Sequence, residues 1–370
     1  MLRAPKGTMP RFAVAAFLLG VPAVSSPAED ACNVEAPRVV AVGDIHGAYD
    51  NFVEVLRMAG IVDEDAHWVG GTAHLVQTGD FTDRGKDTRK VMDLLKRLQK
   101  EAKSAGGRAH ILLGNHEIMN ILGDLRYVDR EEYESFRTMD SMRRIQRFYA
   151  SALSRARDRA EAAGQEFDED AFRKQLEERA PLGFVERTRA FQKDGEYGSW
   201  LRDLNVVARV NGVVFLHGGL TPEVAALGCE GINKKVHREL NKDFDKTLAE
   251  PGSTLAAGGA GPLWYRGLAV EDETAYAPAL EQTLEDMDAR AIVVAHTVTK
   301  TGKIQSRFDG RVVMIDVGMA PAYHDSLAAL EVAGDGTVSA LYPDTRAVIS
   351  MPPAGVAPAV PAESAVGAQP

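Results

Sequence analysis

Two hydrophobic periodicities alternate along the chain, and together they predict an α/β fold. Residues 38–42 form an apolar, β-branched run typical of a buried strand, and apolar positions then recur at helical spacing over residues 52–59. The same pair of patterns follows at residues 73–77 and 91–98, and a third strand is predicted at residues 110–113. Strands that alternate with helices in this way indicate a sheet with helices on its faces.

A second sheet is predicted from the β-type patterns in the last part of the chain. Residues 205–210 and 213–217 flank Asn211-Gly212, a dipeptide that favours a tight turn between antiparallel strands. The remaining strands that we assign to this hairpin-rich sheet are residues 291–295, 311–315 and 327–332.

The middle of the chain has a different character. Residues 129–181 are rich in charge and their apolar positions fall near helical spacing, so we predict a mostly helical insertion that extends to about residue 200. Six arginines between Arg143 and Arg159 would attract phosphorylated substrates at the rim of a site, and a solvated helix face is the alternative. The predicted organisation is one domain over residues 29–350 that contains this insertion.

Both ends of the chain differ from this domain. Arg3, Lys6 and Arg11 precede an uncharged run over residues 12–24, so residues 1–28 have the layout of a secretory signal peptide. An uncleaved anchor or a disordered leader is the alternative. Residues 351–370 are rich in Pro and Ala and carry one charge, which predicts a disordered tail.

Composition and cysteine usage narrow the class of protein. The chain has 370 residues, 45% of them apolar and 26% charged, and a net charge of −10, so it is globular in composition and poorly suited to bind nucleic acid or an anionic membrane surface. Loss of the leader would remove three positive charges and make the net charge −13. We expect a periplasmic or secreted protein with no stable membrane insertion. Cys32 and Cys229 would then meet oxidising conditions and either form a disulfide or stay unrelated thiols.

Side chains that bind metals follow five of the predicted strands. The segments are Gly43-Asp44-Ile45-His46-Gly47, Gly79-Asp80-Phe81-Thr82-Asp83-Arg84-Gly85, Gly114-Asn115-His116-Glu117, His217-Gly218-Gly219 and Ala295-His296-Thr297. Strand ends are where α/β sheets place their sites, and the flanking glycines let backbone pass close to bound ions. Two neighbouring cations need a shared carboxylate and several oxygen or nitrogen ligands, so the pattern predicts a two-metal hydrolase.

These segments resemble the calcineurin-like metallophosphoesterases, and within them the phosphoprotein phosphatase family. The runs that are similar to the Shewanella-like protein phosphatase branch are Asn115-His116-Glu117-Ile118-Met119-Asn120, residues 123–128 and Gly261-Pro262-Leu263-Trp264-Tyr265-Arg266. Leu113-Gly114 stands where the eukaryotic serine/threonine enzymes usually have Arg-Gly, and their terminal Ser-Ala-Pro-Asn-Tyr signature is missing. The resemblance implies a four-layer αββα sandwich.

The resemblance also implies a role for each site residue. The metal ligands would be Asp44, His46, Asp80, Asn115, His217 and His296, with Asp80 shared by both ions. His116 would protonate the leaving oxygen and Asp83 would orient its imidazole, while Arg84, Asn115 and Arg266 would bind the phosphate. Manganese is the metal that the resemblance favours, and the ligand set also suits iron or zinc.

The predicted activity is hydrolysis of phosphoprotein or phosphopeptide substrates by in-line attack of a metal-bridging hydroxide, with His116 as general acid. The resemblance adds phosphotyrosine as a candidate substrate. A dinucleoside polyphosphate hydrolase or a phosphodiesterase would use the same metal residues and is the nearest alternative. A non-catalytic exported protein that binds metal or phosphate is the alternative from another class.

Overall fold

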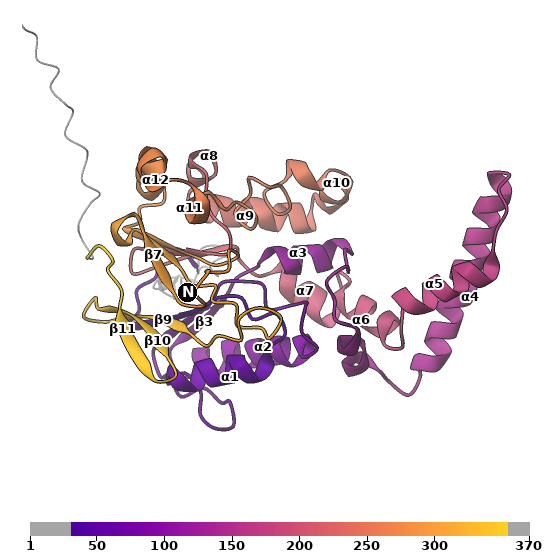
Figure 1. Cartoon of the computed structure of the whole chain (residues 1–370), viewed down its shortest axis with the longest axis horizontal. Helices are drawn as coiled ribbons and strands as arrows, with labels where there is room; N and C mark the ends of the chain where they lie inside the picture. Colours follow the sequence, from indigo (N-terminus) through magenta and orange to yellow (C-terminus); the bar gives the residue numbers. More distant parts are fainter. Residues whose placement is uncertain (1–30, 354–370) are drawn as a thin grey trace, which may run out of the picture.

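Two β-sheets form the centre of the protein in a computed structural model that describes residues 31–353 (Figure 1). The predicted leader, residues 1–28, and residues 354–370 of the predicted tail lie outside the described residues. The strands of the first sheet are β1 (Arg38–Val42), β2 (His74–Gln77), β3 (Arg108–Ile111), β9 (Ala329–Ala333), β10 (Val338–Tyr342) and β11 (Thr345–Val348). Their order across the sheet is β11-β10-β9-β1-β2-β3.

The strands of the second sheet are β4 (Val207–Val210), β5 (Val213–Leu216), β6 (Ala291–Val294), β7 (Gln305–Arg307) and β8 (Val312–Met314). Their order is β4-β5-β6-β8-β7. β5, β6 and β8 run parallel, as do β1, β2 and β3 in the first sheet. Each sheet therefore has a parallel set of strands whose carboxyl ends lie along one edge, where α/β proteins place their sites.

Helices cover the outer face of each sheet. α1 (Tyr49–Met58) and α2 (Thr88–Ser104) lie against the first sheet, at the bottom of Figure 1. The helices on the side of the second sheet, at the top of Figure 1, are α8 (Pro222–Ala225), α9 (Gly228–Asn241), α10 (Phe244–Ala249), α11 (Gly267–Val270) and α12 (Glu273–Asp286).

The alternation of side chains along β1 shows the layering. Val39 and Ala41 belong to a core between the two sheets that also contains Phe215 of β5, whereas Val40 and Val42 belong to the core beneath the helices. Successive strand residues point to opposite faces, so a strand that is buried on both faces reads as a continuous apolar run. The predicted four-layer αββα sandwich is confirmed.

The predicted hairpin between β4 and β5 is confirmed. The two strands pair antiparallel, with Val210 opposite Val213. Asn211 and Gly212 form the turn with φ values of 52° and 68°, the left-handed conformation that a two-residue turn of this type requires at both positions.

One strand assignment was wrong. The strand predicted at residues 327–332 does not join the second sheet, because β9 pairs antiparallel with β1 in the first sheet and places Val332 opposite Val39. Hydrophobic periodicity identifies a buried strand but does not specify its partner, since both sheets contribute to the same core. The second sheet is accordingly built around parallel strands and is less rich in hairpins than expected.

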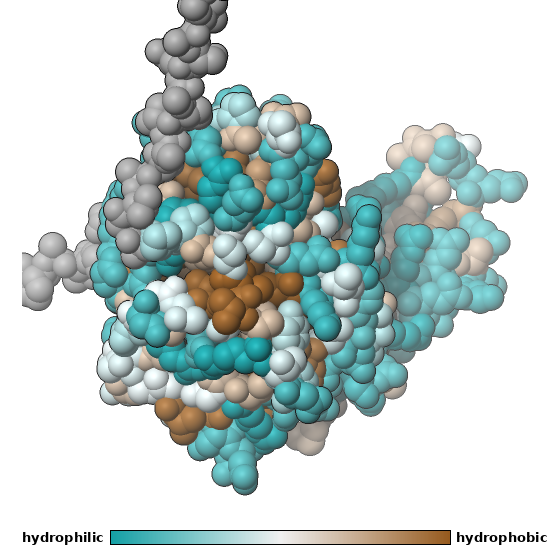
Figure 2. All heavy atoms as spheres, turned by 60° about the vertical axis from the view of Figure 1, so that its left-hand side comes forward, coloured by the Kyte–Doolittle hydropathy of each residue, from teal (hydrophilic) through white to brown (hydrophobic). Residues whose placement is uncertain are grey.

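The segment predicted as helical contains η2 (Arg130–Phe136), α4 (Ser141–Ala162), α5 (Glu169–Arg179), α6 (Phe184–Phe191) and α7 (Glu196–Arg202). Helices α4 and α5 project from the body as an arm (Figure 1), and the surface of this arm is mostly hydrophilic (Figure 2). α5 buries no side chain, and Ile145 and Tyr149 of α4 belong to a small separate cluster. By contrast, η2 packs against α2, and α7 packs against α3 (Asn115–Leu122) and α9. The insertion therefore has an exposed arm and a base that contacts the domain.

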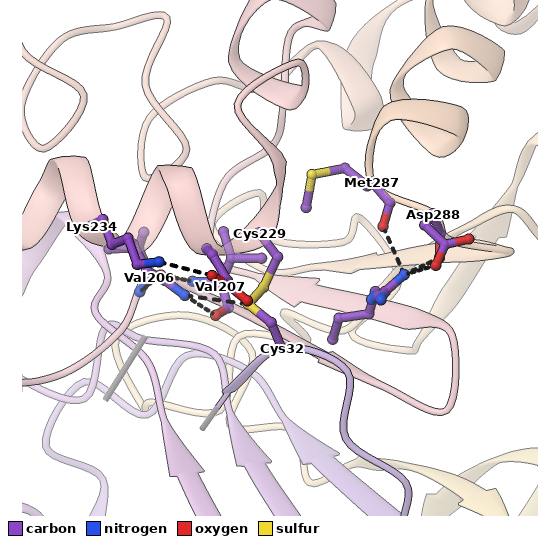
Figure 3. The surroundings of a disulfide bond; sticks show 10 residues. Cys32, Val206, Val207, Cys229, Lys234, Met287 and Asp288 are labelled. Atoms are coloured by element: carbon purple, nitrogen blue, oxygen red, sulfur yellow. Dashed lines mark hydrogen bonds and ion pairs between the residues drawn. A yellow bond between two sulfur atoms is a disulfide. The ribbon is translucent and has the colours of Figure 1, made fainter. Parts of the chain in front are cut away.

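A disulfide joins Cys32, in the segment before β1, to Cys229 at the start of α9 (Figure 3). Asn233 lies one turn further along α9 and accepts hydrogen bonds from the backbone N–H groups of Val206 and Val207, at 2.9 and 3.1 Å. Of the two alternatives for the cysteines, the structure has the disulfide. The bond links the segment before β1 to α9, which lies beside the second sheet. Within residues 31–353, no helix is both long and apolar enough to cross a membrane.

Candidate active site

The parallel strands of both sheets end at one edge, and the predicted site residues lie there. Asp44 and His46 follow β1 and Asp80 follows β2, while His217 and His296 follow β5 and β6. The cavity at this edge has a volume of about 310 Å³. Its lining includes Asp44, His46, Asp80, Arg84, Asn115, His116, Arg266 and His296. The two other predicted residues, Asp83 and His217, are fully buried behind it.

Backbone carbonyls orient two of the histidines. His46 donates its Nδ1–H to the carbonyl of Thr82, and His217 donates its Nδ1–H to the carbonyl of Thr78, both at 3.1 Å. A carbonyl only accepts, so Nε2 of each ring carries the free lone pair. Nε2 of His46 lies 3.8 Å from Oδ2 of Asp80, and Nε2 of His217 lies 3.3 Å from the same oxygen. Both rings therefore direct Nε2 toward one carboxylate oxygen of Asp80.

This convergence fits a pair of divalent cations. Two sets of side chains could each surround one ion, and Asp80 belongs to both of them. The sets are His46, Asp80 and His116, and Asp80, His217 and His296. Asp44 is the candidate ligand in place of His116, because its Oδ2 also lies 3.8 Å from Nε2 of His46. Asn115 adds an amide oxygen, because its Oδ1 lies 2.9 Å from Nε2 of His217. Imidazole, carboxylate and amide donors suit manganese, iron or zinc, and a carboxylate between two cations is what a two-metal site requires.

The protonation states of His46 and Asp80 agree with metal ligation. Burial lowers the pKa of His46 to about 4, which keeps the ring neutral and able to bind a metal. Burial and the neighbouring carboxylates of Asp316 and Asp80 raise the pKa of Asp44. Burial would also raise the pKa of Asp80, but His217 and His116 hold it well below its usual range. Asp80 is thus held in its anionic form.

Asp316 is a site residue that the sequence reasoning missed. It follows β8, lines the same cavity and is 1% exposed. Its Oδ1 accepts the Gly318 N–H at 3.0 Å, while its Oδ2 is buried without a hydrogen-bond partner. Burial raises the pKa of Asp316 to about 6. A carboxylate directly after a predicted strand is the same signal that marked Asp44 and Asp80, so the sequence did contain it.

His116 is held from behind by a buried carboxylate. Its Nδ1–H donates to Oδ2 of Asp83 at 2.8 Å, which leaves Nε2 facing the cavity, 3.8 Å from Oδ2 of Asp80. Burial alone would lower the pKa of His116, but Asp80 and the hydrogen bond with Asp83 outweigh it and raise the pKa overall. An imidazole that is fixed at one nitrogen and open at the other is the arrangement of a general acid.

Two arginines place positive charge on the walls of the cavity. The guanidinium of Arg84 lies between two aromatic rings, 4.5 Å from the centre of Tyr127 and 5.4 Å from that of Tyr323, and its Nε is buried without a partner. Nη1 of Arg266 donates to the His296 carbonyl at 2.7 Å and to Oγ1 of Thr297 at 2.8 Å. Planar guanidinium groups held in this way suit the oxygens of a phosphate.

The backbone of the site is held in uncommon conformations. Positive φ values, between 48° and 67°, occur at His46, Asp80, Asp83, Arg84 and His296. Each such residue costs on the order of 1–3 kcal/mol, and strain of this kind gathers at functional sites. The backbone at Gly114 also lies very close to Asp80, because a Cβ at Gly114 would overlap the Asp80 side chain.

The arginines between Arg143 and Arg159 do not form a rim around the cavity. They lie on α4, in the arm, and none of them lines the cavity. Arg143 pairs with Asp140 at 2.8 Å, and Arg157 pairs with Glu169. The alternative of a solvated helix face agrees with the structure.

Comparison with known proteins places this site in a family. Residues 37–300 match the calcineurin-like phosphoesterases, and the chain belongs to this family. Its fold and family define a metal-dependent phosphatase.

The relatives include members of the branch that the sequence resembles. Shewanella-like protein phosphatase 2 of Arabidopsis thaliana is 32% identical over 313 residues, which cover 81% of this chain and 76% of that protein. Shewanella-like protein phosphatase 1 of Plasmodium berghei is 27% identical over 76% of this chain and 67% of its own length. Among solved structures, the cold-active protein-tyrosine phosphatase of a psychrophilic Shewanella species aligns with a TM-score of 0.64 and 26% identity, covering 86% of this chain and 82% of that one.

Proposed function

We propose that the protein is a two-metal phosphomonoesterase that acts on phosphorylated proteins or peptides. The observation that carries the proposal is the position of the His116–Asp83 pair beside the acceptor atoms that converge on Asp80. One cavity thus combines a cation site, a proton donor and the guanidinium groups of Arg84 and Arg266. Enzymatic hydrolysis of a phosphate monoester with a poor leaving group draws on all three of these functions.

The cations would be held by Asp44, His46, Asp80, Asn115, His217 and His296, with Asp80 between them. Bound there, two divalent ions supply Lewis acidity toward water and toward the phosphate oxygens. Manganese is the proposed metal because the family resemblance favours it, and the mixed oxygen and nitrogen donor set suits iron or zinc equally. Asp316, buried beside Asp44, would add negative charge next to this ligand.

The protein's own side chains would carry out the remaining steps. Arg84, Arg266 and the Asn115 amide would hold the phosphate so that its leaving oxygen faces Nε2 of His116. His116 would give its proton to that oxygen as the bond to phosphorus breaks, and Asp83 would stabilise the positive imidazolium before transfer. The arrangement provides a proton donor without a covalent phosphoenzyme.

Phosphotyrosine is the proposed preferred phosphoresidue. The Shewanella structure to which this chain is similar is a protein-tyrosine phosphatase, and this likeness supports the proposal. Tyr127 and Tyr323 line the cavity beside Arg84, whose guanidinium lies over both rings. A contact between the phenyl ring of a substrate and either tyrosine would contribute about 0.5–1.5 kcal/mol and favour an aryl over an alkyl ester.

Export to the periplasm or the medium is part of the proposal. The Cys32–Cys229 disulfide supports it, because such bonds persist in oxidising compartments. The leader that would direct export lies outside the described residues.

A substrate panel tests the proposed function. The protein, loaded with manganese, is assayed on a phosphotyrosine peptide, a phosphoserine peptide of the same sequence and diadenosine tetraphosphate. We expect the phosphotyrosine peptide to give the highest kcat/KM. Preference for the dinucleotide would establish the polyphosphate hydrolase instead, and full metal occupancy without turnover of any ester would establish a binding protein.

A further inference from the structure

Arg187 connects the helical insertion to the catalytic pair. It belongs to α6, and its side chain is fully buried. Its Nη2 donates to Oδ1 of Asn120 at 2.7 Å, and Nδ2 of Asn120 donates to Oδ1 of Asp83 at 2.9 Å. The same Nη2 lies 3.9 Å from Oδ1 of Asp83. A continuous hydrogen-bonded path therefore runs from the insertion through Asp83 to His116.

Asn120 contacts both members of the catalytic pair. It lies four residues after His116 on α3, and its Nδ2 also donates to the His116 carbonyl at 2.9 Å. One oxygen of Asp83 thus accepts from Asn120 and the other accepts from the His116 imidazole. With both oxygens engaged, the Asp83 carboxylate has a single orientation, and that orientation aims the imidazole.

A second residue of the insertion holds Arg187 in place. Nε of Arg187 donates to Oε1 of Glu132 on η2 at 2.6 Å, and the guanidinium lies 4.3 Å from the ring centre of Phe191. Nη1 of Arg187 is nevertheless buried without a partner. A buried charged group with an unsatisfied donor costs stability relative to apolar packing, so stability alone does not account for Arg187 here.

We propose that Arg187 and Asn120 are positioning residues for the general acid, so that the base of the helical insertion sets the orientation of His116. This inference rests on the proposed function, because it assigns the insertion a part in the same proton transfer. Nη2 of Arg187 lies 3.9 Å from Oδ1 of Asp83 and donates to the Asn120 side chain that binds this same oxygen, so it limits how the carboxylate can turn. Without this support Asp83 would turn or move, and His116 would no longer meet the leaving oxygen.

The test uses leaving groups that differ in their need for a proton. Arg187→Met is compared with Arg189→Met, which removes an exposed arginine from the same helix. Both are loaded with manganese and assayed on 4-nitrophenyl phosphate and on a phosphoserine peptide. General acid catalysis is worth about 10²–10⁴-fold, so we expect Arg187→Met to lose about 100-fold in kcat on the peptide. On 4-nitrophenyl phosphate, whose leaving group departs without a proton, we expect a loss below about 5-fold. Arg189→Met should match the wild type.

A double mutant shows whether Arg187 acts through Asp83. If it does, Asp83→Asn/Arg187→Met will be no slower than Asp83→Asn alone, since residues that act as a unit are not additive. Asn120→Ala leaves the Arg187–Glu132 pair intact and should give the same dependence on the leaving group, even if Arg187→Met fails to fold. Equal losses on both substrates, or multiplied losses in the double mutant, would overturn the positioning role. A wild-type protein that hydrolyses neither substrate would instead overturn the proposed function.

Discussion

Glu117 lies buried beside Asp80 and accepts the backbone N–H of that residue at 2.8 Å. Its carboxylate also accepts the N–H groups of Phe81, Thr82 and Gly114, at 3.1, 3.0 and 2.8 Å. One side chain of α3 therefore fixes the loop that follows β2, and with it the residue that would lie between the two cations.

Replacing this carboxylate should loosen the loop. In Glu117→Gln an amide NH₂ would face backbone N–H groups, so at least two donors would lose their acceptor. Each buried donor that is left unsatisfied costs about 1–3 kcal/mol, and we expect a loss of about 3 kcal/mol in the free energy of unfolding. Urea unfolding measures it, with Glu161→Gln on the exposed arm as the control. A loss below about 1 kcal/mol in Glu117→Gln would show that the loop does not depend on Glu117.

Removal of the proposed general acid should affect substrates unequally. A phenol leaves more readily than an alkyl alcohol, so it depends less on protonation by His116. His116→Asn should lose at least about 100-fold in kcat/KM on a phosphoserine peptide and clearly less on an aryl phosphate. Steady-state kinetics on both substrates measure the difference. Equal losses would remove His116 from the role of general acid.

Asp316 should contribute to metal affinity. Its carboxylate is buried next to Asp44, and outer groups of this kind typically change metal affinity by about 10–100-fold. Asp316→Asn keeps the shape and the acceptor for the Gly318 N–H but removes the charge. We expect manganese to bind about 10-fold more weakly, as measured by competition with a chelator. Asp325→Asn, an exposed substitution in the same loop, is the control, and unchanged affinity in Asp316→Asn would contradict this role.

A histidine pair away from the cavity should make the fold sensitive to acid. Nε2 of His110 on β3 lies 3.2 Å from Nδ1 of His74 on β2, and burial together with His74 and Arg108 lowers the pKa of His110 to about 3. A histidine in the unfolded chain has a pKa near 6.5. Below that pH His110 is protonated in the unfolded state but neutral in the folded state, so the free energy of unfolding falls as the pH falls.

We therefore expect the wild type to lose about 2 kcal/mol between pH 7 and pH 5 through this one group. His110→Leu should remove that part of the slope, whatever its effect on stability at pH 7. Urea unfolding of both proteins at the two pH values measures it. An identical pH slope in both proteins would show that His110 is not the group responsible.

Most of the predicted site residues line one cavity, and the sequence marks the metal ligands among them by their place after a strand. Asp44, His46 and Asp80 come directly after buried strands, and the glycines beside them let the backbone pass close to bound ions. The strand pairing was harder, since the apolar run of β9 fits either inner face of the sandwich.

Contacts between segments that are far apart in the chain could not be predicted from the sequence. Arg187 reads as one of many charged residues in a helical insertion, and only the packing of α6 against η2 brings it to Asn120. Tyr323 reads as a loop residue, yet its ring lies 5.7 Å from that of His46. Hydrophobic periodicity predicts the helices and strands, and the sequence motifs predict the ligands. The groups that position those ligands depend on tertiary structure.

Metal stoichiometry is the most direct test of the proposal that six side chains hold two cations and that Asp80 is shared by both. We expect chelated protein to be inactive and to bind two equivalents of manganese per chain in a calorimetric titration, with activity returning as the sites fill. Asp80→Asn should bind at most one equivalent and stay inactive. Full phosphatase activity in metal-free protein, or two equivalents bound unchanged by Asp80→Asn, would contradict the account.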